Sequence, residues 1–185
     1  MKKLITAVAC AAALCVGGAA RAGVLTFDDP GVIDIDNVTN VATYTESGFT
    51  ISGQAATFLT LASTLVGGID GTSSLSLKAL GDGAFSLLSL DYAFFDLGFG
   101  APPGTLTLIG QLGGAQVASE VLSLGAVAHF DFGADFRNVT EVTFTGSSGF
   151  ALDNISAVPE PGTMALTTIA LMGMVLRVRK RRIAA

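Results

Sequence analysis

Between residues 23 and 157 the chain consists of short runs in which apolar and polar positions alternate. No stretch of ten residues in this region holds helical periodicity. The clear period-two runs are Thr43 to Ile51, Ser74 to Leu80, Thr105 to Leu108 and Val139 to Thr145. Such alternation places one set of side chains in a core and the other in solvent, so the pattern predicts an all-β body.

One apolar run changes phase in its middle. Phe85 and Leu87 share one parity. Leu88, Leu90 and Tyr92 take the other parity. A slip between Leu87 and Leu88 is what a β-bulge, or a bend between two sheets, produces.

Clusters of glycine, aspartate, asparagine and proline separate the runs, as turns require. Residues 105–124 are typical of a hairpin that turns at Gly113-Gly114. No repeat has a fixed period, and no linker is long enough to divide the body. We therefore expect a single antiparallel β-sandwich over residues 23–157, with the jelly roll as the favoured arrangement.

The first 22 residues are typical of a secretory signal peptide. Lys2 and Lys3 precede an apolar run, and Ala20-Arg21-Ala22 forms an A-x-A site. The pattern predicts that the export machinery cleaves before Gly23, with a retained membrane anchor as the less favoured alternative. Both cysteines of the chain lie in this removable segment, so the mature protein has no thiol and no disulfide.

The C-terminal segment, residues 158–182, combines three features in a fixed order. Pro159-Glu160-Pro161 comes first, and 15 uncharged residues follow from Gly162 to Leu176. A basic cluster ends the segment and comprises Arg177, Arg179, Lys180, Arg181 and Arg182. We expect a single transmembrane helix over about 162–178, somewhat shorter than the ~20 residues of a comfortable span, with the basic cluster on the cytoplasmic side to stop transfer. The prolines predict an extended chain that is open to a protease just outside the membrane.

This order of features resembles the PEP-CTERM sorting signal of Gram-negative bacteria, a segment also named after the C-terminus of ice-binding proteins. The resemblance covers about residues 158 to 182 and implies recognition by an exosortase, a membrane protease-transpeptidase that removes the tail near Pro159-Glu160-Pro161. It also implies association with exopolysaccharide or biofilm. An ordinary C-terminal anchor is the alternative reading of the same residues.

The body is also loosely similar to galactose-binding-like jelly rolls. The similarity lies in an acidic first strand, Leu25 to Asp29, and in a closing Asp-Asn pair within Phe150 to Ile155. It implies a fold, and it raises sugar binding as a hypothesis.

Charge removes one class of partner from consideration. Residues 23–158 carry two basic residues, Lys78 and Arg137, against fourteen acidic ones, which gives a net charge of −12. A body this acidic repels phosphate, so we exclude nucleic acid as a partner.

The acidic side chains suggest a cation instead. Asp28 and Asp29 follow the first apolar run, while Asp153 and Asn154 lie in the last one. First and last strands of a jelly roll often lie side by side, and carboxylate and amide oxygens are the ligands that Ca²⁺ prefers. The pattern therefore leaves two readings open, a structural calcium site or solvated acids on turns. No EF-hand spacing is completed.

Catalytic signals are weak. His129 is the only histidine and lies in the strand-like run 128–132, with no nucleophile motif beside it. We interpret it as a structural or surface residue and expect a protein that is not an enzyme. Phe99, in the loop 98–104, is the most plausible exposed ring for stacking on a sugar, although loop aromatics often fold back onto the core.

Three functions follow, in order of preference. The first is an exported surface or matrix protein, held transiently in the inner membrane, sorted by an exosortase and associated with extracellular polysaccharide. The second is a carbohydrate-binding module with a defined sugar site. The third is a polysaccharide hydrolase that uses a pair of carboxylates.

Overall fold

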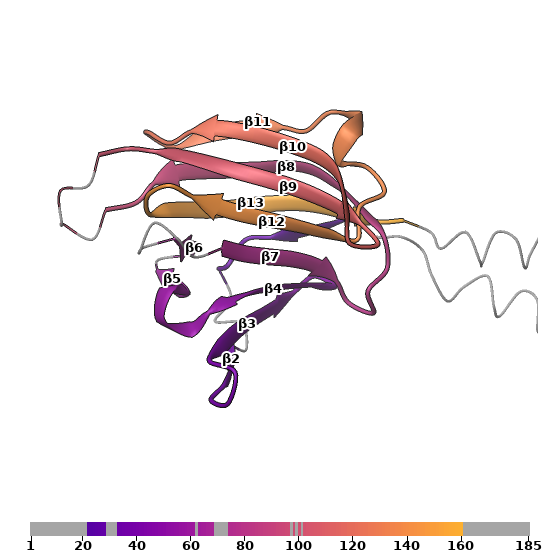
Figure 1. Cartoon of the computed structure of the whole chain (residues 1–185), viewed down its shortest axis with the longest axis horizontal. Helices are drawn as coiled ribbons and strands as arrows, with labels where there is room; N and C mark the ends of the chain where they lie inside the picture. The colour runs from indigo at the N-terminus through magenta and orange to yellow at the C-terminus, as the bar shows by residue number, and fades with distance from the viewer. Residues whose placement is uncertain are drawn as a thin grey trace, which may run out of the picture. The chain divides into compact units, whose positions relative to one another are not determined.

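The computed structural model describes residues 22–160, apart from 29–32, 62, 69–73, 97, 99 and 101. Two antiparallel sheets form a sandwich in this part of the chain, which confirms the predicted fold class (Figure 1). The predicted signal sequence up to Arg21 and the tail from Pro161 onward lie outside the described residues. Within the described ranges, no helix is long and apolar enough to cross a membrane.

The first sheet, called sheet A below, carries the last strand of the sandwich near its centre. Its strands in spatial order are β11 (Ala128–Asp131), β8 (Phe85–Phe94), β13 (Phe150–Pro159), β6 (Thr64–Gly67) and β5 (Leu59–Leu61). Strand β1 (Gly23–Leu25) also pairs with β13, with Leu25 opposite Ile155. The first and last strands therefore lie side by side, as expected for a jelly roll.

The second sheet, sheet B, has seven strands among the residues that the structure describes. Their spatial order is β10 (Ala115–Ser123), β9 (Thr105–Leu112), β12 (Glu141–Gly146), β7 (Ser74–Ala79), β4 (Phe49–Gln54), β3 (Val41–Glu46) and β2 (Ile33–Asp36). Two short 3₁₀ turns, η1 (Ala55–Thr57) and η2 (Ala134–Phe136), connect strands. From β6 to β9, and again from β10 to β13, successive strands alternate between the sheets, a crossing pattern typical of jelly rolls.

The core lies between the two sheets and follows the predicted alternation. Leu75 and Leu77 of β7, and Val142 and Phe144 of β12, are fully buried. Phe49 of sheet B meets a phenylalanine of sheet A edge to face, with ring centroids 5.4 Å apart. Apolar burial of this kind is the main stabilising contribution in a body that contains no cysteine and hence no disulfide.

The run from Thr43 to Ile51 differs from its prediction, because it is a hairpin and not one strand. Strand β3 ends at Glu46 and β4 begins at Phe49, with Ser47 and Gly48 between them at φ 52° and 86°. A two-residue turn keeps the alternation of apolar and polar positions in phase, so the two strands have the sequence pattern of a single strand. The hairpin predicted at Gly113-Gly114 is confirmed, with φ of 58° and 85°.

The phase slip at Leu87 and Leu88 is also confirmed. Leu87 and Leu90 are fully buried, whereas Leu88 is 38% exposed. The pairing of β8 with β13 shifts register at this point, and β13 adds a compensating residue between Asp153 and Ser156. Sheet A therefore carries a bulge on each of its two central strands, directly beside the cleft described next.

Candidate functional site

A cleft of about 350 Å³ lies on the side of sheet A that faces away from the core. Ala93 of β8, Ala151 of β13 and Val66 of β6 are neighbours across three strands and form its floor. Leu61, Phe95 and Val127 contribute to its walls. The floor thus carries two small alanine side chains, and we call this feature the sheet A cleft.

Alternation along β13 explains why the cleft has this floor. Phe150 and Leu152 are fully buried in the core between the sheets. Successive side chains point to opposite faces of a strand, so Ala151 and Asp153 point away from the core and line the cleft. Strand β13 thus contributes side chains to the core, a residue to the floor of the cleft, and the carboxylate of Asp153.

Two carboxylates mark the polar end of the cleft. Asp91 of β8 and Asp153 of β13 are cross-strand partners, and both line the cleft. Directly opposite residues on paired strands have Cβ atoms about 5 Å apart. The sequence alone singled out no carboxylate pair, and the structure identifies this one.

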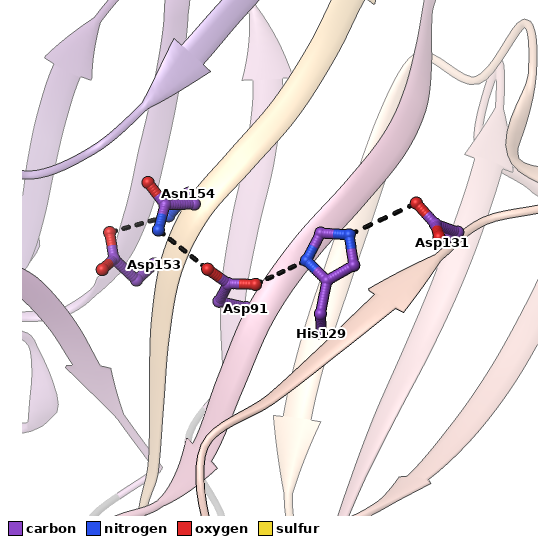
Figure 2. A network of polar contacts seen from close by, with 5 residues as sticks. All are labelled: Asp91, His129, Asp131, Asp153 and Asn154. Carbon is purple, nitrogen blue, oxygen red and sulfur yellow. Dashed lines mark hydrogen bonds and ion pairs between the residues drawn. The ribbon is translucent and has the colours of Figure 1, made fainter.

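A chain of polar contacts extends from this end of the cleft (Figure 2). His129 Nδ1 lies 2.5 Å from Asp91 Oδ1, and its Nε2 lies 3.3 Å from Asp131 Oδ1. Asn154 Nδ2 donates to Asp91 Oδ2 at 2.8 Å, and its backbone N–H donates to Asp153 Oδ1 at 2.7 Å. We call these five residues the polar cluster.

The contacts of the polar cluster move the pKa values of its members apart. The hydrogen bond from His129, and next that from Asn154, holds the pKa of Asp91 below its usual range. The same bond to Asp91, helped by Asp131, raises the pKa of His129. Each partner therefore favours the charged form of the other.

Asp153 behaves in the opposite way. Partial burial raises its pKa, and the charges of Asp91, Asp28 and Glu46 raise it further, against the lowering effect of the Asn154 N–H. Two neighbouring carboxylates with opposite shifts can hold different protonation states at one pH. The cleft therefore offers both a hydrogen-bond acceptor and a carboxyl group that takes up a proton more readily.

A left-handed backbone at Asn154 positions its side chain. Asn154 has φ 47° and occupies the bulge of β13. Asparagine tolerates this conformation better than most residues, because its short polar side chain can hydrogen-bond locally. Here that side chain reaches across to Asp91.

The structure brings some of the expected calcium ligands near one another. Strand β1 pairs with β13, and Asp28, three residues beyond β1, is close enough for its charge to act on Asp153. Asp29 lies outside the described residues. In the part of the chain that the structure describes, no three His, Cys, Asp or Glu residues are arranged to hold a metal ion. A calcium site that includes Asp29 stays a prediction.

Phe99, the expected sugar-stacking ring, and the two tyrosines of the body are placed differently. Phe99 lies outside the described residues. Tyr44 is buried and packs on Phe27 with ring centroids 5.1 Å apart, so it presents no face to a ligand. Tyr92 packs against the core and also borders the sheet A cleft.

The sorting motif begins inside the fold. Strand β13 continues to Pro159, two residues past the expected end of the sandwich at Ala157, and Glu160 follows it directly. Both residues are half-buried. Pro161 and the basic cluster lie outside the described residues, as does the predicted membrane span.

Comparison with known families identifies the tail. Residues 157–182 match the model of the PEP-CTERM protein-sorting motif. The chain therefore carries a PEP-CTERM sorting signal, as its residues indicated, and this signal defines an exported protein that is sorted to the cell surface. A sequence comparison with curated proteins gives no match.

Two solved structures share the general outline of the body. One is CBM29_1, a family 29 carbohydrate binding module from Piromyces equi, with 13% identity and a TM-score of 0.47 over 77% of this chain and 92% of that one. The other is a carbohydrate binding module of family 29, with 13% identity and a TM-score of 0.47 over 76% of this chain and 89% of that one. Likeness at this level does not identify a ligand.

Proposed function

We propose that the protein is an exported surface or matrix protein of a Gram-negative bacterium, which an exosortase processes near Pro159-Glu160-Pro161. Its β-sandwich then associates with extracellular polysaccharide. The observation that carries this proposal is the match of residues 157–182 to the sorting motif, directly continuous with the last strand of a folded sandwich.

The physical character of the tail supports a transient stay in the inner membrane. The 15 uncharged residues from Gly162 to Leu176 are fewer than the ~20 of a stable span, and the following basic cluster stops transfer. A marginal span beside a cleavable motif suits a sorting intermediate better than a permanent anchor.

Intact-mass measurement of the surface form tests this proposal. We expect a chain that starts at Gly23 and ends near the motif, with or without a covalent addition. Deletion of the host's exosortase, or replacement of Pro159, Glu160 and Pro161 by alanine, should leave the longer form in the inner membrane. A surface form that retains Arg177 to Ala185 would show that the tail is a plain anchor.

A second function, the binding of a defined saccharide in the sheet A cleft, is favoured by the shape and chemistry of that cleft. About 350 Å³ falls within the usual range for a small-ligand site. The alanine floor can pack against the C–H face of a sugar ring. The carboxylates of Asp91 and Asp153 can accept hydrogen bonds from its hydroxyl groups.

A glycan array with the purified surface form tests this second function. We expect retention of at least one polysaccharide, and weaker retention for Asp153→Asn than for the control Asp82→Asn, which lies in the exposed turn after β7. Equal retention of both variants would place sugar binding elsewhere.

The same samples test whether the sandwich cleaves what it binds. We propose binding without cleavage, because Asp91, the carboxylate that would have to attack the sugar or activate water beside Asp153, is already engaged in hydrogen bonds with His129 and Asn154. Release of reducing ends that stops in Asp153→Asn would establish the hydrolase instead.

A further inference from the structure

The first two residues of the sorting motif extend the pairing of β13 with β8 in sheet A. Pro159 lies opposite Phe85 of β8, at the end of the ladder between β13 and β8. Proline has no N–H, so the next donor along the chain is the N–H of Glu160, which bonds to the carbonyl oxygen of Ala84 at 2.8 Å. The backbone of the motif is therefore paired along the edge that faces β8.

The side chain of Glu160 is held as well. Ser86 Oγ donates a hydrogen bond to Glu160 Oε1. Ser86 is only 6% exposed, so water has little access to the donor, and a hydrogen bond to an ionised carboxylate is stronger than one between neutral groups. The only charged residue of the motif is thus tied to a buried residue of β8.

A membrane protease that binds the motif would need the same backbone edge and the same carboxylate that these contacts engage. Enzymes that recognise an extended peptide commonly bind its backbone along an edge and its side chains in pockets. For Pro159 and Glu160, one backbone edge and one carboxylate oxygen already belong to the folded body. The motif cannot offer both to another protein while β13 remains paired to its end.

We propose that the contact between Ser86 and Glu160 latches the sorting motif onto the sandwich, so that the end of β13 must separate from β8 before an exosortase can bind it. This inference rests on the proposed processing by an exosortase. Strand ends open locally at far lower free energy than the whole domain, so opening can occur while the core stays folded. Ser86 then sets the rate at which the motif becomes available.

Amide hydrogen exchange tests the latch itself. The full chain is purified in detergent micelles from a host that lacks the exosortase. We expect the Glu160 amide to be protected in the original chain, and Ser86→Ala to speed its exchange about three- to tenfold. Ser89→Ala, three residues further along the same strand, should leave it unchanged. An unprotected Glu160 amide, or one that Ser86→Ala does not affect, would overturn the proposal.

Amides of β12, in the other sheet, keep the exchange experiment interpretable. They report global unfolding, so faster exchange confined to Glu160 identifies local opening. Equal acceleration at β12 and Glu160 would mean that Ser86 merely stabilises the whole fold, and it would overturn the latch.

Pulse-chase labelling in cells that contain the exosortase tests the consequence. Ser86→Ala should shorten the half-life of the long precursor about threefold or more relative to both the original chain and Ser89→Ala. Exosortase-dependent cutting at equal rates in all three chains would overturn the latch and leave the proposed function intact. Cutting that does not depend on the exosortase in any chain would overturn the proposed function, and the latch with it.

Discussion

The bulge at Asn154 allows its backbone and side-chain contributions to be separated by two substitutions. Asn154 combines a left-handed backbone, at φ 47°, with a side-chain hydrogen bond of 2.8 Å to Asp91. Asn154→Gly removes the side chain but accepts the backbone conformation, because glycine has no Cβ. Asn154→Ala removes the same hydrogen bond but keeps a Cβ in the left-handed region, without the polar side chain that makes asparagine tolerant of this conformation.

The expected magnitudes follow from these two effects. Loss of the hydrogen bond costs about 0.5–1.5 kcal/mol in either variant. Relative to glycine, alanine has about 1–2 kcal/mol of backbone strain in this conformation. Glycine loses more chain entropy on folding, and this loss offsets part of the difference. We therefore expect Asn154→Ala to be less stable than Asn154→Gly by about 1 kcal/mol, or about 4 °C in melting temperature for a domain of this size.

Thermal unfolding at pH 7, followed by circular dichroism, measures the difference in stability. Asn37→Ala, in the exposed turn after β2, serves as the control and should have the same melting temperature as the original chain. Carboxyl NMR titration should show the pKa of Asp91 moving up toward its ordinary value in both Asn154 variants. Equal melting of the alanine and glycine variants would refute the strain argument, and an unchanged pKa of Asp91 would refute the hydrogen bond.

Three further predictions address packing, pH and metal. Gly68→Ala should lower the melting temperature by several degrees, because Gly68 has φ +64° and an added Cβ would lie 2.6 Å from a buried ring of β13. The control Gly83→Ala places its Cβ in open space and should leave the melting temperature unchanged. The pKa of His129 is raised and that of Asp91 is lowered. The ion pair should therefore stabilise the fold most between about pH 4 and 6.5. The free energy of unfolding should decrease as the pH falls through the pKa of Asp91, and also as it rises through the pKa of His129. Denaturant titration across pH should show both decreases, and both should be smaller in Asp91→Asn. If the acids at the two ends of the body share calcium, the melting temperature should be higher in millimolar calcium than in chelator. Asp153→Asn should abolish that shift. Identical melting curves of the original chain in the two buffers would exclude the site.

The strands themselves could be predicted because their evidence is local. Leu75, Leu77 and Ala79 alternate with polar residues, and the structure buries all three. The one misassigned run, Thr43 to Ile51, contains a turn of two residues, and such a turn leaves the period of two unbroken. Only Gly48 signalled a break there.

The polar cluster could not be predicted, because its members come from three separate strands. Asp91 and His129 are 38 residues apart in the chain, and Asp91 and Asn154 are 63 apart. Their contacts depend on which strands are neighbours and on the bulge that turns Asn154 toward Asp91. Only Asp131, two positions from His129 and hence on the same face of β11, could have been paired with it from the sequence.

Strand β13 also limits where the protein can be cut without damage. Its pairing with β8 covers Phe150 to Pro159, and Ala157, near the end of that pairing, is fully buried. A cut before Ala157 would remove the end of a central strand and expose the core beside β8. A cut at or after Glu160 leaves the ladder, the core and the sheet A cleft intact. The fold therefore favours processing on the C-terminal side of Pro159, where only the end of β13 that the proposed latch between Ser86 and Glu160 holds has to open.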